Sequence, residues 1–241
     1  MPPKPSSARL TGKAKIRWGI ADFVVVWLGA LVIAAIASSL VIGLRGRESD
    51  APLDAVDLVI GLLIQNIVIV VALFAVSRMR GRDSLRCDFG LIVRFRDWPW
   101  LAGGVIVGAA GIALIEVLDR SGNGLAEQKA VQILDRATGP ELVVLIIGVT
   151  VIAPLAEELL FRGLLLRSLG RIWSAPVAVA LSSAAFAGVH LLDPATAYLL
   201  VPLGLLGLVA GIRATRTGEL SQPICLHAGF NLLSAVLLVA T

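Results

Sequence analysis

The chain is built from long runs of apolar residues that are separated by short polar segments. Several of these runs reach the roughly twenty residues that an α-helix needs to cross the hydrocarbon core of a bilayer. The pattern therefore predicts an all-α fold, a polytopic transmembrane helical bundle with about seven spans. The expected spans are approximately 20–44, 58–77, 101–118, 141 to the paired acids near 158, 176–192, 195–212 and 220 to the end of the chain.

The polar segments between the runs predict how the helices are oriented. Arginines gather after the second, fourth and sixth runs, most densely from Arg78 to Arg96, whereas Asp119–Pro140 has no such excess. Because Lys and Arg concentrate in cytoplasmic loops, we expect a multi-pass protein of a bacterial cell membrane with its amino terminus in the cytoplasm. Within the external segment, 125–138 has helical spacing and is expected to lie along the membrane surface. The expected regions are a basic cytoplasmic tail (1–17), N-terminal membrane helices and loops (18–140) and a C-terminal membrane core (141–241).

Composition supports a membrane protein and excludes an ordinary soluble domain. Hydrophobic residues make up 57% of the 241 residues and charged residues 16%, and the mean hydropathy is +0.89. The formal net charge of +4 does not indicate nucleic-acid binding, because the arginines lie in the loops between apolar runs. Membrane lipid is the expected partner, and nucleic acid is not. The two cysteines, Cys87 and Cys225, form no disulfide framework.

Two adjacent acids, Glu157 and Glu158, interrupt the fourth apolar run. Ionisable groups in the hydrocarbon region are costly, so each needs a partner or a wet cavity. Glu158 and Arg162 lie four residues apart on one face of a helix and are predicted to form an ion pair. Glu157 is rotated by about 100° from Glu158, so this pair leaves its carboxylate available for another role.

Both histidines of the chain also lie in apolar runs. Phe186 and His190 are four residues apart in the fifth run, and His227 and Asn231 are four residues apart in the seventh. Each pair therefore projects from one helical face. Small residues around both pairs allow neighbouring helices to approach closely. The concentration of ionisable and polar groups in these runs favours a functional site over isolated structural residues.

The depth of these groups in the membrane can be estimated by counting residues. From the turn expected near 170–174, Glu157 and His190 both rise by about 20–25 Å at 1.5 Å per residue, so they can meet. His227 is only about seven residues into its run. It reaches the same level only if the fourth helix extends beyond the membrane or the seventh helix is displaced.

Two amides, Gln65 and Asn66, lie in the middle of the second run. Amide side chains within a membrane commonly form hydrogen bonds between helices. We therefore expect these two residues to hold helices together rather than to bind a ligand.

The three spacings resemble the motifs of a known family, the CAAX prenyl protease and bacteriocin-processing (CPBP, or Abi) intramembrane proteases. The resemblance covers the chain from about Glu141 to its end, so that 141–241 is the expected catalytic core. The motifs lie in order on spans four, five and seven: Glu-Glu-x-x-x-Arg (Glu157, Glu158, Arg162), Phe-x-x-x-His (Phe186, His190) and His-x-x-x-Asn (His227, Asn231).

This resemblance implies a glutamic-type intramembrane endopeptidase that needs no cofactor. Glu157, assisted by His190, would activate a water that attacks a peptide carbonyl. His227 and Asn231 would bind the resulting oxyanion. The substrate would be a membrane-associated protein or peptide, with or without a lipid modification. The supporting residues would be Glu158, Arg162 and Phe186.

Two alternatives stay open. Glu157, His190 and His227 are of the residue types that bind zinc, which would give a metalloprotease, although the chain has no His-Glu-x-x-His motif. A non-catalytic bacteriocin-immunity or regulatory membrane protein would use the same cavity to bind a peptide or lipid. A proton-coupled transporter is disfavoured, because such proteins usually contain internal repeats and none is visible in this sequence.

Overall fold

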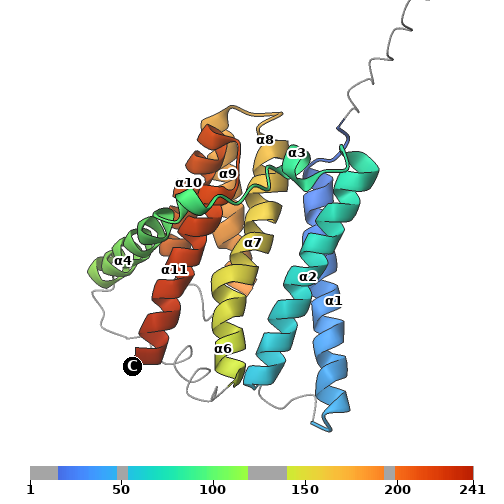
Figure 1. The fold of residues 1–241 in the computed structure, drawn as a ribbon, viewed down its shortest axis with the longest axis vertical. Helices are drawn as coiled ribbons and strands as arrows, with labels where there is room; N and C mark the ends of the chain where they lie inside the picture. Colours follow the sequence, from blue (N-terminus) through green and yellow to red (C-terminus); the bar gives the residue numbers. More distant parts are fainter. Residues whose placement is uncertain (1–15, 48–53, 119–139, 193–198, 241) are drawn as a thin grey trace, which may run out of the picture.

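The computed structural model describes residues 16–47, 54–118, 140–192 and 199–240, and these residues fold into a bundle of helices (Figure 1). No strand is present among them, which confirms the predicted all-α class. Most of the predicted tail (1–17), the segment 125–138 and the predicted start of the sixth span at Ala195 lie outside the described residues.

The apolar runs form helices close to the predicted ones. Within the described residues, six helices are long and apolar enough to cross a membrane, and α11 is a seventh long helix, which agrees with about seven spans. The long helices are α1 (Ile20–Leu44), α2 (Ala55–Arg80), α4 (Trp100–Leu118), α9 (Ala175–Val189) continued by η4 (His190–Leu192), α10 (Leu200–Thr217) and α11 (Ser221–Ala240). The fourth span consists of α6 (Pro140–Ile147), η2 (Gly148–Ile152), α7 (Ala153–Glu158), η3 (Leu159–Leu166) and α8 (Arg167–Leu169). Two short elements precede α4, namely α3 (Leu85–Phe89) and η1 (Phe95–Asp97).

In the first two helices, packing determines which face is buried, and a cap determines where α2 begins. In α1 the side chains of Phe23, Val26 and Ala30 are buried, whereas Val25 and Val32 are exposed and suited to contact lipid. Because the helix is apolar all round, packing rather than polarity sets its orientation. The start of α2 is fixed by Asp54, whose side chain accepts a hydrogen bond from the Asp57 N–H in a capping box.

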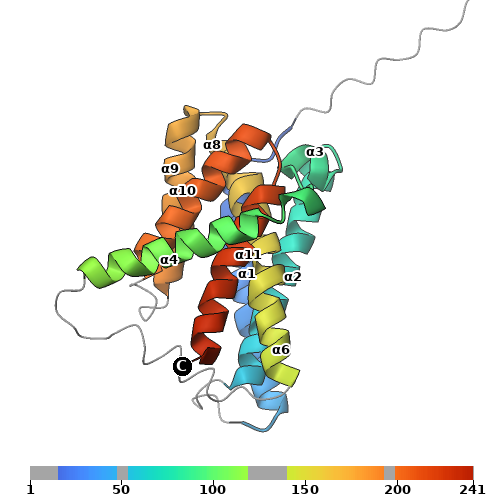
Figure 2. The same cartoon turned by 60° about the vertical axis from the view of Figure 1, so that its left-hand side comes forward.

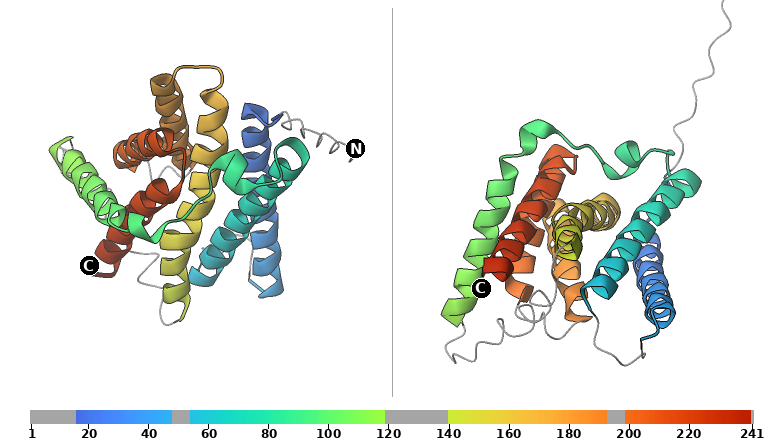
Figure 3. Two further views of the ribbon diagram at one scale, coloured as in Figure 1. Left: turned by 45° about the horizontal axis from the view of Figure 1, so that its top comes forward. Right: turned by 60° about the horizontal axis from the view of Figure 1, so that its bottom comes forward.

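The fourth span is the central helix of the bundle. It lies between the α1–α2 pair on one side and the α4–α11 pair on the other, as the right-hand view of Figure 3 shows. All eight residues of η3 are buried. The segments η2 and η3 are π-helical, so the backbone on both sides of the paired acids departs from a regular α-helix.

Helix α4 crosses α11 obliquely (Figure 2), and glycines allow the two backbones to touch. A Cβ atom on Gly229 would lie 2.0 Å from the Leu101 carbonyl oxygen, and one on Gly104 would lie 1.9 Å from the Leu226 carbonyl oxygen. Only glycine fits at both positions. Small residues are a common means of close helix packing in membranes, and here they fix the position of the helix that carries His227.

The arginine-rich turns after α2, α8 and α10 gather at one end of the bundle (Figure 1). The Arg167 Nη2 group donates to the Gly218 carbonyl oxygen at 2.6 Å, Arg171 donates to the Trp18 carbonyl oxygen, and Arg94 pairs with Glu219. Helix connectivity therefore agrees with the predicted alternation of the basic loops. That this end faces the cytoplasm stays a prediction.

Candidate active site

The predicted pair of Glu158 and Arg162 is confirmed and lies in the core of the bundle. Arg162 Nη1 donates to Glu158 Oε1 at 2.9 Å, and both side chains are 0% exposed. The guanidinium also donates to the Gly207 carbonyl oxygen of α10 at 3.2 Å and lies 4.4 Å above the centre of the Phe186 ring. The pair thus joins the fourth span to α9 and α10.

His227 of α11 completes this cluster and has a defined orientation. Its Nδ1 atom lies 2.9 Å from Glu158 Oε1, and because an ionised carboxylate only accepts, the hydrogen belongs on Nδ1. Its other ring nitrogen, Nε2, lies 3.7 Å from Glu157 Oε2. A neutral His227 therefore turns an unprotonated Nε2 toward Glu157, and only the protonated imidazolium can donate a hydrogen bond from that atom.

Glu157 differs from its neighbour because it borders a cavity. Its side chain is 25% exposed, against 0% for Glu158. The cavity has a volume of about 220 Å³ and lies between α1, α2, the fourth span and the end of α9. Its walls are mostly apolar, with Trp27 and Leu62 among them, and His190 also lines it. The sequence placed Glu157 and His190 at one depth, and both border this space.

The hydrogen bond from Nδ1 also defines the tautomer of His190. Nδ1 lies 2.8 Å from the Phe186 carbonyl oxygen, and since a carbonyl oxygen can only accept, Nδ1 carries the hydrogen. In the neutral ring Nε2 is therefore a hydrogen-bond acceptor. Phe186 separates the two histidines: its ring centre lies 5.3 Å from each imidazole, in edge-to-face contact.

Asn231 is held by a backbone carbonyl that the sequence did not indicate. Its Nδ2 group donates to the Val149 oxygen of η2 at 2.7 Å. In this π-helical segment the Ala153 N–H bonds to the Gly148 oxygen, so the next such bond would join residue 154 to Val149. Pro154 has no N–H to donate. The proline thus leaves the Val149 oxygen for Asn231, and Pro154 in the apolar run was the available signal.

The meeting of His227 with the acids resolves the depth question raised by the sequence. The bond between Arg167 and the Gly218 oxygen places the start of α11 beside Arg167 rather than beside the turn at 170–174. His227 follows Gly218 by 9 residues (227 − 218), and Glu157 precedes Arg167 by 10 (167 − 157). The fourth span, Pro140–Leu169, has 30 residues, more than the roughly twenty that a bilayer requires. Its extension therefore brings the two groups to one level.

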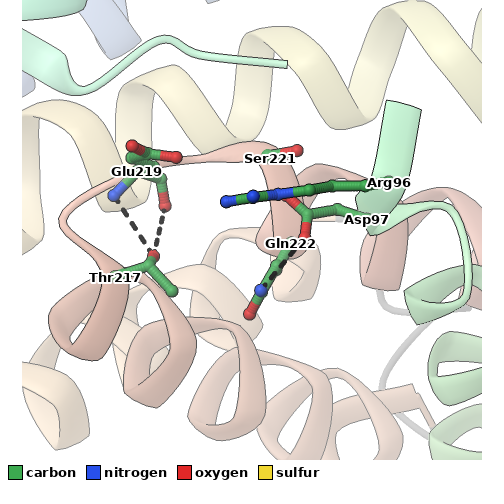
Figure 4. Close-up of a pocket in the computed structure, with 6 residues that line it drawn as sticks. All are labelled: Arg96, Asp97, Thr217, Glu219, Ser221 and Gln222. Atoms are coloured by element: carbon green, nitrogen blue, oxygen red, sulfur yellow. Dashed lines mark hydrogen bonds between the residues drawn. The ribbon is translucent and has the colours of Figure 1, made fainter. Parts of the chain in front are cut away.

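A second cavity lies at the turn between α10 and α11 (Figure 4). It has a volume of about 250 Å³, is lined by polar residues that include Arg96 and Glu219, and contains none of the predicted site residues. The Gln222 side chain donates to Asp97 at 3.2 Å, and Thr217 accepts from the Glu219 N–H at 3.2 Å. The first bond attaches the start of α11 to η1, and the second lies within the turn that leads into α11.

The prediction that Gln65 and Asn66 of α2 form hydrogen bonds between helices was wrong. Asn66 Nδ2 donates to the Leu62 oxygen at 2.8 Å, within its own helix rather than to a neighbour. Gln65 forms no hydrogen bond to any other described residue, and both amides line the cavity that contains Glu157. Packing turned this face of α2 toward the cavity, which helical spacing alone did not reveal.

The residues of the zinc alternative do not form a metal site in this arrangement. Among the described residues no three His, Cys, Asp or Glu side chains lie close enough together to hold a metal ion. One of the two acids, Glu158, is already committed to Arg162 and His227. That the site needs no cofactor stays a prediction.

Comparison with known proteins confirms the resemblance over the motif region. Residues 139–233 match the family model described as type II CAAX prenyl endopeptidase Rce1-like, and this range contains all three motifs. The chain is also similar to an uncharacterised 24.3 kDa protein of Escherichia coli, with 28% identity over 134 residues that cover 54% of this chain and 58% of that protein. The chain thus matches little more than half the length of that relative. No solved structure matches it.

Proposed function

We propose that this protein is an intramembrane endopeptidase in which Glu157 activates the water that attacks a peptide carbonyl. The observation that carries the proposal is a partly exposed carboxylate that borders an apolar cavity together with His190 and lies 3.7 Å from His227. The family match over 139–233 supports it. The substrate class that follows from the family description is a protein whose carboxyl-terminal Cys-aliphatic-aliphatic-X sequence carries a prenyl group on the cysteine.

The first step is the attack of water on the peptide carbonyl carbon. A water molecule between Glu157 and His190 would donate one hydrogen to each, because the Glu157 carboxylate and the His190 Nε2 atom are both acceptors. As the water oxygen bonds to the carbon, Glu157 takes up the proton, and the carbonyl oxygen becomes an oxyanion. His190 orients the water, and Phe186 holds His190 through the bond from Nδ1.

The oxyanion would be stabilised by His227 and Asn231. Asn231 uses one N–H on the Val149 oxygen, and its second N–H is left for the substrate. His227 can donate from Nε2 only as the imidazolium, because Nδ1–H is engaged with Glu158. Donors placed toward a developing oxyanion are a major source of rate enhancement.

The second step is the collapse of the tetrahedral intermediate. The carbon–nitrogen bond breaks as the oxyanion reforms a carbonyl, and the proton held by Glu157 passes to the departing nitrogen. Glu157 returns to its carboxylate form, so the cycle needs no metal or other cofactor. Glu158 and Arg162 take no part in these transfers and hold His227 in place.

The experiment that tests this proposal measures cleavage of an internally quenched, farnesylated CAAX peptide by the full chain in detergent. We expect Glu157→Gln to lower kcat by about 10²–10⁴-fold, since Gln keeps the size of Glu but cannot accept a proton. Glu116→Gln is the matched control, because Glu116 is an exposed acid at the end of α4, and its rate should equal that of the wild type. His227→Ala and Asn231→Ala should each lower kcat by about 100-fold.

Other outcomes would favour the alternatives. A full rate in Glu157→Gln would remove this residue from the mechanism. Binding of the peptide by the wild type without cleavage would support an immunity or regulatory function. Loss of activity with a chelator, stoichiometric metal in the active protein and rescue by zinc would support the metalloprotease. We expect the rate to be unchanged by the chelator.

A further inference from the structure

Helix α2 contributes one wall of the cavity that contains Glu157. Leu62, Gln65, Asn66 and Ile69 line this cavity, and their spacing of three, four and seven residues defines a single helical face. Residues on another face of α2, such as Val71 at 61% exposure, are turned outward. Gln65 is therefore directed into the bundle beside the fourth span, which Figure 3 shows next to α2.

The two neighbouring amides on this wall differ in their bonding. Asn66 is 5% exposed, and its Nδ2 group is satisfied by the Leu62 oxygen. The Gln65 carboxamide has two N–H donors and one oxygen acceptor, and it bonds to none of the described residues. A polar group among apolar walls is costly unless water or a ligand satisfies it. Within the apolar stretch 58–72 of α2, these two amides are the only polar side chains.

We propose that Gln65 binds the main chain of the substrate peptide. An extended peptide offers an N–H and a C=O at each residue, and one carboxamide can accept from the first and donate to the second. Gln65 carries no charge, so its chemistry suits an amide better than a phosphate headgroup or a cation. This inference rests on the proposed function, in which the peptide occupies the cavity beside Glu157.

Such a contact affects binding more than chemistry. Gln65 lies on α2, whereas the groups that move protons or hold the oxyanion lie on the fourth span, α9 and α11. Loss of the contact removes an interaction that the peptide makes in both the bound complex and the transition state. An interaction of this kind changes KM and leaves kcat nearly constant.

The first test compares Gln65→Met with the wild type in the farnesylated-peptide assay. Met matches Gln in length but cannot form the paired hydrogen bonds. We expect KM to rise by about 3- to 10-fold, the effect of one or two hydrogen bonds, with kcat within twofold of the wild type. Ile67→Met, on an outward-facing residue at 57% exposure, is the matched control and should change neither value. A KM for Gln65→Met within 1.5-fold of the control would overturn the inference. A fall in kcat by the same factor as the rise in KM would also overturn it.

The second test separates this inference from the proposed catalytic role. The farnesylated peptide, labelled with a fluorophore, is titrated with Glu157→Gln and with Glu157→Gln/Gln65→Met, and its anisotropy gives Kd. We expect the second variant to bind the peptide about 3- to 10-fold more weakly than the first. The ratio of the two Kd values should be smaller for a peptide that is N-methylated at the residue to which Gln65 bonds. If the wild type fails to cleave but this difference is found, the catalytic proposal fails and the binding role of Gln65 stands. Equal Kd values, or no binding to either protein, would refute the binding role.

Discussion

Replacement of Arg162 by Met tests whether the Glu158–Arg162 pair holds the site together. The change removes the 2.9 Å bond to Glu158 and the 3.2 Å bond to the Gly207 oxygen. It leaves a fully buried Glu158 carboxylate that keeps its hydrogen bond from His227. Removal of one member of a buried ion pair typically costs about 3–5 kcal/mol, because the other charge stays buried. For a chain of this length, each kcal/mol lowers the melting temperature by roughly 2–4 °C.

We therefore expect Arg162→Met to melt about 6–20 °C below the wild type in detergent. The five tryptophans of the chain allow unfolding to be followed by intrinsic fluorescence. The control is Arg216→Met, an exposed arginine in the last turn of α10, which should shift the free energy of unfolding by less than about 0.5 kcal/mol.

A double variant distinguishes loss of the pair from loss of packing. Glu158→Gln/Arg162→Met removes both charges and leaves an amide oxygen that can accept from His227. It should be more stable than Arg162→Met alone, because replacement of both partners avoids the uncompensated charge. A melting temperature for Arg162→Met equal to that of the control would contradict this reasoning. So would a double variant whose loss equals the sum of the two single losses.

Two further predictions concern packing and pH. Gly229→Ala should destabilise the protein by about 1–3 kcal/mol in thermal unfolding, because its Cβ would lie 2.0 Å from the Leu101 oxygen. The control is Gly204→Ala, whose Cβ would meet nothing within 4 Å and which should be neutral or slightly stabilising. Equal effects of the two substitutions would refute the packing argument. Burial opposes ionisation of Asp88, but hydrogen bonds from Ser77 and Arg82 outweigh it and lower the pKa of this carboxyl. A lowered folded-state pKa gives stability that is present above the unfolded value, about 3.9, and is lost as the pH falls through the folded value. The melting temperature of Asp88→Asn should thus lie below that of the wild type at pH 7, with a gap that narrows below about pH 4; a gap independent of pH would contradict this assignment.

The helices and the Glu158–Arg162 pair were predictable because they depend on local spacing. A run of about twenty apolar residues has few alternatives to a membrane helix, and the α1 bounds agree with the prediction at both ends. Residues four apart meet whatever surrounds the helix. The predicted resemblance was also confirmed over residues 139–233, because the three motifs depend on the same local spacing.

The relations between helices were not predictable in the same way. The level at which α11 begins depends on a bond between Arg167 and Gly218, residues 51 positions apart. The bonding of Gln65 and Asn66 depends on which face of α2 meets the cavity, and for a helix that is apolar all round no polar face reveals this. The partner of Asn231 is a main-chain oxygen, 82 positions away. Pro154 indicates that a carbonyl lacks its backbone donor, but it does not indicate which side chain will bind there.

The irregular backbone of the fourth span connects these observations. In a regular α-helix each interior carbonyl oxygen already accepts from a backbone N–H of its own helix, whereas Asn231 donates to an oxygen that Pro154 cannot reach with such a donor. The π-helical turn of η2 and the missing N–H of Pro154 supply this acceptor at Val149. Departures of this kind cost stability and persist where the surrounding structure compensates for them, often at functional sites. Here the compensation comes from Asn231 and from the complete burial of η3. Pro154, three residues before Glu157, thus leaves the carbonyl oxygen that holds Asn231 beside the paired acids.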